Sequence, residues 1–328
     1  RSTEGRPVTL RALYDLPAPA KLNLFLHVLG RRADGYHLLQ SPFVLIDWAD
    51  TLHLERRDDG AIQRHDRGAT LPDDDLCLRA ARALQRASGC SAGVDITIDK
   101  VVPWGAGLGG GSSDAATVLL GLNRLWGLGW SRAQLLALAA TLGADVPFFV
   151  GGRNAFVEGI GERLTPIVLP RLWLAVLKPA AALPTADVFA SPLLKRDSVA
   201  AILAGSLADD IDTAGAGQGP KGSTQADVAN AEPSPGPLVG LQELINGFGH
   251  NDLQRAAESR CPEVAQAAEW LQARFGNARM TGSGSAVFAR AGTGDQPMAT
   301  WPAEAVPSGW VGRMCRSLAV HPLAGWAG

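Results

Sequence analysis

Alternation of apolar and polar residues near the N-terminus predicts a β-strand. The segment KLNLFLHVL begins at Lys21, and every second residue from Leu22 to Val28 is aliphatic. Residues two apart on a strand point to the same side of a sheet. The pattern therefore predicts that the side chains of Lys21 and Asn23 lie together, on the side opposite to the leucines.

The rest of the chain predicts a mixture of strands and helices. Short β-branched runs indicate strands, whereas apolar residues three and four positions apart indicate helices. Strands are expected at residues 43–47, 51–55, 94–98, 155–158 and 172–177, and helices at residues 76–87, 115–126, 131–142 and 264–275. Ser131 is a good N-cap for the third helix. Pro42 has no backbone N–H, so it predicts a sheet edge or a bulge at the second strand.

Length and composition predict two domains and one poorly packed segment. The 328 residues are 46% hydrophobic, which allows a sizeable core and exceeds the usual length of one domain. We place the first domain at residues 12–165 and the second at residues 166–328. Residues 205–237 are rich in Gly, Ala, Ser, Asp and Pro, so they predict a disordered insertion.

Charge and cysteine content exclude several classes of partner and site. The formal net charge of -2 gives no electrostatic reason to expect nucleic acid or an anionic membrane as partner, so a small-molecule substrate is expected. The four cysteines form no CxxC pair and no histidine lies at zinc-ligand spacing, so we expect reduced thiols in a cytoplasmic protein and predict no metal site. The sequence contains neither a signal-peptide pattern nor an apolar run of the ~18 residues that a membrane span needs.

The segment GAGLGGGSS at residues 105–113 predicts a phosphate-binding loop that leads into a helix. A helix N-terminus presents about four N–H groups without partners, and glycines let phosphate oxygens approach the backbone. Gly105, Gly107 and Gly110 also satisfy the dinucleotide pattern GxGxxG, but no acidic residue for the ribose occurs between Asp114 and Asp145. The missing GK[ST], HRD and DFG elements exclude a P-loop and a protein kinase. A tight turn that binds nothing is the remaining alternative.

Three segments resemble the motifs of the GHMP kinases. PWGAGLGGGSSDAA, from Pro103, is similar to the second motif, and RMTGSGSAVFA, from Arg279, is similar to the third, a glycine loop that closes the nucleotide site. PAPAKLNLFLHVLGRRADGYH, from Pro17, is similar to the first motif. This segment and LPTADVF have the form typical of members that phosphorylate 4-diphosphocytidyl-2-C-methyl-D-erythritol. The resemblance implies a small-molecule kinase of isoprenoid precursor biosynthesis that uses ATP with Mg²⁺ and phosphorylates the 2-hydroxyl group of that alcohol.

The same resemblance implies a two-domain α+β fold. The N-terminal domain would be similar to domain 2 of ribosomal protein S5, and the C-terminal domain would be ferredoxin-like. Asp145 is implied as the general base, and Lys21 as the cation that stabilises its ionised form and polarises the attacking oxygen. Asp145 could instead cap a helix or a turn, and Lys21 could be a solvated residue at a strand edge.

The resemblance implies three further sets of site residues. The ATP-binding set is Pro103, Gly105, Gly107, Leu108, Gly109, Gly110, Gly111, Ser112 and Ser113, in which the serine hydroxyls could reach phosphate or Mg²⁺. The substrate-binding set is Asn23, Tyr36, His37, Thr185 and Phe189, with cytosine between the rings of Tyr36 and Phe189. The third glycine motif supplies Gly282, Ser283 and Gly284. Asp75, near the adenine, and Asp114 depart from the family, which usually has Asn at the first position and often Asn or a small residue at the second.

Three alternatives remain for the function. Another GHMP kinase, of mevalonate or homoserine type, is disfavoured by DGYH and LPTADVF. A nucleotide-binding regulator without catalysis is disfavoured because both Lys21 and Asp145 are retained. An NAD-binding oxidoreductase would lack its ribose-binding acid.

Overall fold

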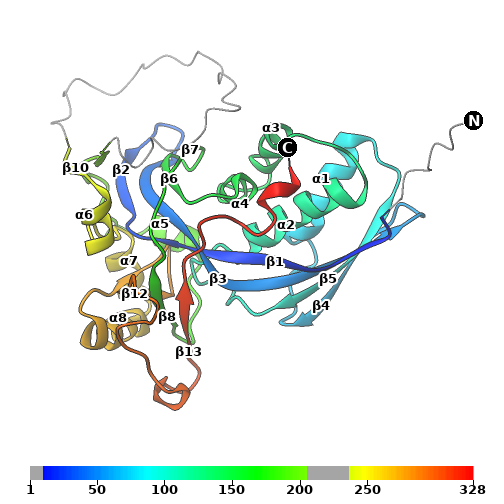
Figure 1. The fold of residues 1–328 in the computed structure, drawn as a ribbon. Helices are drawn as coiled ribbons and strands as arrows, with labels where there is room; N and C mark the ends of the chain where they lie inside the picture. The colour runs from blue at the N-terminus through cyan, green and yellow to red at the C-terminus, as the bar shows by residue number, and fades with distance from the viewer. Residues whose placement is uncertain (1–9, 205–235, 328) are drawn as a thin grey trace, which may run out of the picture.

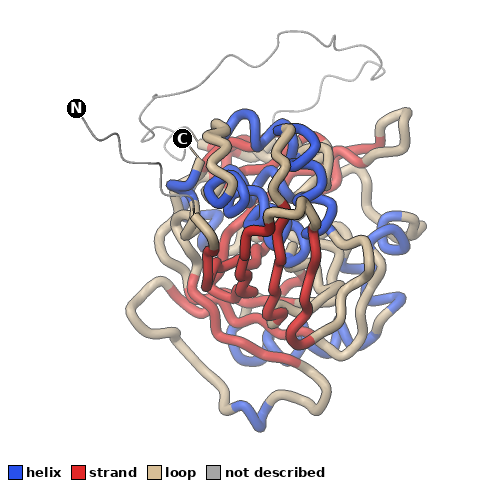
Figure 2. The backbone as a smooth tube through the Cα atoms, turned by 90° about the vertical axis from the view of Figure 1, so that its right-hand side faces the viewer, coloured by secondary structure: helices blue, strands red, loops and turns tan. Residues whose placement is uncertain are grey.

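The computed structural model describes residues 10–204 and 236–327. Helices cover one face of a seven-stranded sheet, a four-stranded sheet packs on its other face, and further helices cover the outer face of that second sheet. Figure 1 shows this succession, and Figure 2 shows the strands lying between helices above and below. The predicted α+β class is confirmed. The insertion predicted at residues 205–237 lies outside the described residues except for its last two positions.

The seven-stranded sheet is built around one long strand. β3 (His37–Arg57) pairs with β1 (Ala12–Asn23), β2 (His27–Arg31), β5 (Gly93–Lys100) and β6 (Ala155–Gly159). β4 (Ile62–Gly68) pairs with β5, and β7 (Arg163–Pro166) pairs with β6. The sequence predicted two short strands in place of β3. That prediction was wrong because Asp50, in the apparent gap, is fully buried and stays paired with Ala18 of β1.

The predicted strand from residue 21 is divided into two, and Pro42 explains the division. The Pro42 carbonyl accepts a hydrogen bond from the N–H of Leu24 at 3.0 Å, but its nitrogen, on the same side, has no proton to donate. The ladder therefore stops at Asn23 and resumes at His27. On its other side Pro42 pairs with Phe156, so the prediction of a sheet edge at Pro42 was wrong. In place of the predicted bulge, the neighbouring strand is interrupted between Asn23 and His27.

Four helices cover one face of the first sheet: α1 (Leu76–Ser88), α2 (Gly110–Leu125), α3 (Arg132–Ala139) and α4 (Val146–Gly151). Ser131 caps α3 through a capping box with Gln134, as the sequence predicted. α2 starts inside the glycine run and not at residue 115. Glycine has low helix propensity, so the pattern did not reveal this first turn, which is stabilised by the burial of the rest of α2.

The second sheet has the order β11 (Arg279–Met280), β12 (Val287–Gly292), β8 (Trp173–Lys178), β13 (Val311–Arg316) and is antiparallel throughout. Leu174 and Val176 of β8 pack toward the first sheet. Ala175 and Leu177 pack toward α7 (Gln254–Arg260) and α8 (Pro262–Phe275). Since both faces are covered, the run at residues 172–177 is apolar without alternation.

Shorter elements are α5 (Thr185–Phe189), β9 (Ile202–Leu203), β10 (Leu238–Val239), α6 (Leu241–Asn246) and the 3₁₀ turns η2 (Ala303–Ala305) and η3 (Ala324–Trp326).

The residues after β13 return to the first sheet. Ser317 forms a bridge with Ile46, and Val320 forms one with Arg153. The Arg132 guanidinium donates to the carbonyls of Ala324 and Ala327, and Figure 1 shows this end of the chain beside α1 and α2. The division of the chain at residue 165 stays a prediction, and the last residues of the second half pack on the first half.

Gly121 of α2 provides a test of how closely the helices approach the sheet. A Cβ atom there would lie 2.5 Å from Leu54 Cδ1 and 3.0 Å from Leu16 Cδ1, and both leucines are buried. We expect Gly121→Val to lower the free energy of unfolding by about 1–3 kcal/mol, the usual cost of overpacking a core. Urea denaturation measures this change. Gly151→Val is the matched control, because no atom lies within 4 Å of its Cβ position; an equal loss in both variants would contradict close packing at Gly121.

Candidate active site

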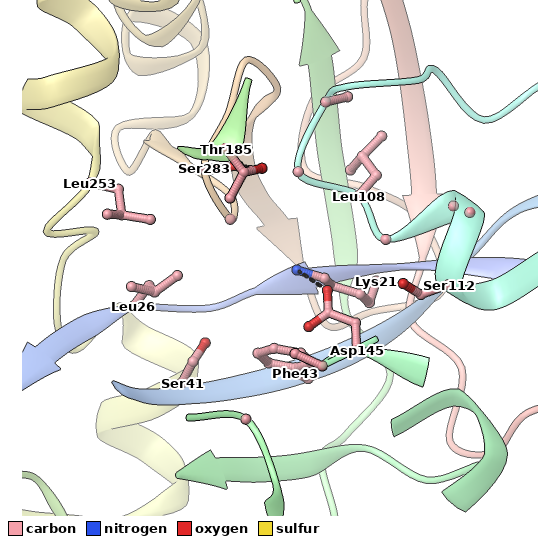
Figure 3. Close-up of a pocket in the computed structure, with 18 of the residues that line it drawn as sticks. Lys21, Leu26, Ser41, Phe43, Leu108, Ser112, Asp145, Thr185, Leu253 and Ser283 are labelled. Atoms are coloured by element: carbon pink, nitrogen blue, oxygen red, sulfur yellow. Dashed lines mark hydrogen bonds and ion pairs between the residues drawn. The ribbon is translucent and has the colours of Figure 1, made fainter. Parts of the chain in front are cut away.

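A cavity of about 600 Å³ brings the three motif segments together. Its wall is formed by β1, β3, the glycine loop before α2, the turn before α4, α5 and the loop after β11. Figure 3 shows Lys21 and Asp145 at its centre, with Ser112 on one side and Leu26 and Leu253 on the other. Residues far apart in the sequence therefore face one common space.

Lys21 and Asp145 form an ion pair across this cavity. Lys21 Nζ lies 3.6 Å from Asp145 Oδ2; the lysine side chain is 4% exposed and the aspartate side chain 32% exposed. Asp145 occupies the N-cap position of α4, but its carboxylate makes no capping hydrogen bond. The capping alternative for Asp145 therefore has no support, and its carboxylate is directed at Lys21 and the cavity.

The environment of Lys21 is largely apolar. Its ammonium group lies 4.6 Å from the centre of the Phe43 ring. Burial lowers the pKa of Lys21, and the charge of Asp145 opposes that shift. Lys21 is therefore not the solvated strand-edge lysine of the alternative interpretation, but a buried cation whose charge depends on its partners.

Asn23 holds Lys21 in place from below. Its Oδ1 accepts a hydrogen bond from Lys21 Nζ at 2.6 Å, which confirms that the two side chains lie on one side of β1. Its Nδ2 donates to Ser41 Oγ at 2.7 Å, and its backbone N–H donates to Thr281 Oγ1 at 2.9 Å. Asn23 thus ties β1 to β3 and to the third glycine motif.

The glycine loop before α2 forms one side of the cavity. Gly107 and Gly109 have φ angles of 75° and 71°, in the left-handed region that favours glycine. Gly109 is the N-cap of α2 and has no side chain to accept a hydrogen bond. The first residues of the helix line the cavity, and no side chain caps their N–H groups. This arrangement is suited to phosphate oxygens.

The third glycine motif touches the second one backbone to backbone. A Cβ atom at Gly107 would overlap the carbonyl oxygen of Thr281, and one at Gly282 would lie 2.8 Å from the carbonyl oxygen of Gly107. Ser283 shares a hydrogen bond of 2.8 Å with Thr185 of α5. The second sheet therefore closes the cavity over the first.

The predicted cytosine-binding residues lie together at another part of the cavity wall. The rings of His37 and Phe189 are 5.1 Å apart and tilted by 36°, whereas Tyr36 is 61% exposed. Arg196 Nε donates to His37 Nε2 at 3.1 Å. Burial, followed by the charges of Arg196 and Arg31, lowers the pKa of His37. Because Nε2 accepts the hydrogen bond from Arg196, Nδ1 is the donor nitrogen of the ring.

Three predicted residues do not line the cavity. Asn23 lies beneath Lys21. Ser113 is buried and its hydroxyl donates to the carbonyl of Pro19 at 2.6 Å, so of the two serines in the second motif Ser112 is the one that lines the cavity. Gly284 faces Met280 and Leu183. All other residues of the predicted sets line the cavity: Lys21, Tyr36, His37, Pro103, Gly105, Gly107, Leu108, Gly109, Gly110, Gly111, Ser112, Asp145, Thr185, Phe189, Gly282 and Ser283.

The two residues that depart from the family pattern are engaged within the protein. Asp75 caps α1, because its carboxylate accepts a hydrogen bond from the N–H of Leu78 at 3.1 Å. It also forms an ion pair with Arg64 at 2.7 Å. Asp114 is buried and pairs with Lys100, which lines the cavity. Sequence reasoning missed Lys100 and Arg196, since neither lies in a glycine motif nor shows a periodicity that points to the site.

Neither a metal cluster nor a membrane span is found in the described part of the chain. Among residues 10–204 and 236–327, no group of three or more His, Cys, Asp or Glu side chains could hold a metal ion. No helix of the same residues is long and apolar enough to cross a membrane.

The sequence is similar to GHMP kinases in both halves. The family model for the GHMP kinases N terminal domain matches residues 75–153, and that for the GHMP kinases C terminal matches residues 235–297. The 4-diphosphocytidyl-2-C-methyl-D-erythritol kinase of Methylibium petroleiphilum is 60% identical over 98% of this chain and 100% of the relative. The protein of the same name from Verminephrobacter eiseniae is 54% identical over 97% of this chain and 99% of the relative.

Solved structures agree with these relatives. A crystal structure of 4-(cytidine 5'-diphospho)-2C-methyl-D-erythritol kinase matches with a TM-score of 0.69 and 34% identity, over 92% of this chain and 98% of that chain. Homoserine kinase from Cytophaga hutchinsonii matches with a TM-score of 0.61 at 16% identity, over 98% of each chain, which shows a shared fold alone. Identity of this extent over nearly the whole of both chains shows that this chain belongs to the GHMP kinases, in the family of the 4-diphosphocytidyl-2-C-methyl-D-erythritol kinases.

Proposed function

We propose that this chain transfers the γ-phosphate of ATP to the 2-hydroxyl group of 4-diphosphocytidyl-2-C-methyl-D-erythritol, giving the 2-phosphate and ADP in isoprenoid precursor biosynthesis. The observation that carries the proposal is the ion pair of Lys21 and Asp145 in a cavity that also holds the glycine loop and the His37 and Phe189 rings. The relatives that are 60% and 54% identical carry the name of this kinase.

Asp145 is placed to act as the general base. Its carboxylate lies 3.6 Å from Lys21 Nζ, is 32% exposed, and makes no capping hydrogen bond. In the proposed reaction it accepts the proton of the 2-hydroxyl group while that oxygen attacks the γ-phosphorus. The bond from the γ-phosphorus to its bridging oxygen breaks, and ADP leaves. Lys21 places a positive charge beside the attacking oxygen.

The glycine loop is placed to bind the phosphates of ATP. The N-terminus of α2 and the loop from Gly105 to Gly109 offer backbone N–H groups and the positive end of a 16-residue helix. Little covalent chemistry is required of the protein in such a transfer, so positioning and charge stabilisation carry the catalysis.

The residues of the cavity fit a magnesium ion that is held mainly by the nucleotide. Mg²⁺ keeps several waters and is usually bound by one or two protein oxygens together with substrate phosphates. The cavity presents the Ser112 hydroxyl beside the helix N-terminus, a protein oxygen of the kind that this mode uses. When bound, the ion neutralises charge on the phosphate oxygens. We propose Ser112 as its protein ligand.

Recognition of the cytidyl group is assigned to Tyr36, His37, Phe189 and Thr185. The Phe189 and His37 rings form an aromatic corner, and Tyr36 is exposed at the rim, where it can close over a base. His37 presents Nδ1–H as a donor because Arg196 occupies Nε2. A kinase of mevalonate or homoserine type would have no use for this corner.

The first prediction concerns the acceptor. In an assay that couples ADP release to a colour change, we expect turnover with 4-diphosphocytidyl-2-C-methyl-D-erythritol and none above background with mevalonate, homoserine or free methylerythritol. The reason is that the aromatic corner binds the cytidyl group, which the other alcohols lack. Equal turnover with mevalonate or homoserine would contradict the proposed substrate.

The second prediction concerns the ion pair. Asp145→Asn and Lys21→Met should each lower kcat by about 10² to 10⁴, the range for lost acid–base catalysis, while the dissociation constant for ADP changes little. Asp74→Asn, at a 69% exposed carboxylate outside the cavity, is the control. Near wild-type turnover of Asp145→Asn would remove the general-base assignment.

The third prediction concerns the aromatic corner. Phe189→Ala and Tyr36→Ala should each raise KM for the cytidyl substrate by roughly tenfold, in line with the free energy of stacking one base, and leave KM for ATP unchanged. The chain has two tyrosines, and Tyr14→Ala is the matched control because Tyr14 is 57% exposed and lies outside the cavity. A rise in KM for ATP in Phe189→Ala would place the cytosine elsewhere.

A further inference from the structure

Lys100, at the end of β5, is a buried cation with two carboxylate partners. Its Nζ donates to Asp114 Oδ2 at 2.6 Å and also to Asp50 Oδ2. The side chains of Lys100, Asp50 and Asp114 are 3%, 0% and 1% exposed. The mechanism derived from Lys21 and Asp145 makes no use of this group, which we name the Lys100 cluster.

The Lys100 cluster joins the two ends of the phosphate-binding loop. Asp50 Oδ1 accepts the backbone N–H groups of Val101 at 2.6 Å and Val102 at 2.7 Å, where the chain leaves β5 and enters the loop. Asp114 lies in α2, where the loop has ended. The ammonium group of Lys100 therefore connects the beginning of the loop, through Asp50, with its end, through Asp114.

The cation also touches the loop itself. A Cβ atom at Gly110 would lie 3.0 Å from Lys100 Nζ and 3.1 Å from a methyl group of Val102. The space that a side chain at the first residue of α2 would occupy is thus filled by the ammonium group, and Lys100 forms part of the cavity wall. The ammonium group of Lys100, paired with two aspartates, therefore lies directly behind the helix N-terminus that faces the phosphates.

Stability does not account for such a cluster. A buried ion pair is often no more stabilising than apolar side chains of the same volume. Here two carboxylates share one cation, and Asp114 Oδ1 has no hydrogen-bond partner among the described residues. The cluster is therefore explained better by what it positions than by what it contributes to folding.

We propose that Lys100 is a positioning residue for the phosphate donor, which acts through Asp50 and Asp114 to hold the loop at residues 101–110 in its phosphate-binding shape. This rests on the proposed function, in which that loop binds ATP. The acceptor lies against Tyr36, His37 and Phe189, on another part of the wall, so binding of the cytidyl substrate is independent of the cluster.

The test compares nucleotide and acceptor binding in Lys100→Met and Asp114→Leu. Both variants should weaken ADP binding in calorimetry and raise KM for ATP by about tenfold or more, while KM for the cytidyl substrate stays within about twofold. Asp114→Asn keeps an oxygen acceptor for Lys100 and should remain within about threefold of wild type in both constants. Unchanged ADP binding in folded Lys100→Met, or a parallel rise of both Michaelis constants, would overturn the proposal.

A second variant keeps the test decisive if Lys100→Met does not fold. Lys100→Met combined with Asp114→Asn removes the cation together with one carboxylate and leaves Asp50 bonded to two backbone N–H groups. It should show the same weakening of ADP binding, and wild-type ADP binding in it would overturn the proposal. Calorimetry with ADP needs no acceptor, so failure of the wild type to phosphorylate the cytidyl substrate would count against the proposed function and not against the role of Lys100.

Discussion

The packing of the second sheet onto the first is the constraint on which the site depends. Where the cavity closes, the Thr281 hydroxyl accepts the N–H of Asn23 at 2.9 Å and the N–H of Ala286 donates to the carbonyl of Ala106 at 3.1 Å. The first bond ties β1 to the third glycine motif, and the second joins two glycine loops whose backbones touch, so the space for a nucleotide is defined by both halves of the chain. Neither half contains the whole site.

The same packing explains why the charged groups of the site are buried. β1 is covered on both faces, so Lys21 and Asn23 lie in an interior that is apolar except for their own partners. In such surroundings an ion pair is stronger than in water, and each unpaired group costs more. The ammonium group of Lys21 is paired with Asn23 and Asp145 and lies near the Phe43 ring. The ammonium group of Lys100 is paired with two aspartates.

Much of the site could be predicted from the sequence, because its residues lie in motifs where local chemistry and spacing carry the information. The glycine loop and Lys21 beside Asn23 are examples, and in the fold outside the site the Ser131 cap is another. What could not be predicted depends on tertiary contacts. The continuity of β3 through Asp50 requires a buried cation from β5, and the break before His27 depends on which side of β3 the Pro42 nitrogen faces. Arg196 reaches His37 from a segment without regular structure, so no periodicity in the sequence indicates it.

The return of residues 317–327 to the first sheet has a consequence for the order in which the chain can fold during synthesis. Leu323 and Ala327 are buried in the core beneath α1 to α4, and Arg132 of α3 is bonded to carbonyl groups of this segment. These residues leave the ribosome after every other described residue. The N-terminal half can form its strands and helices early, but its core stays open on one side until residues 317–327 have been made.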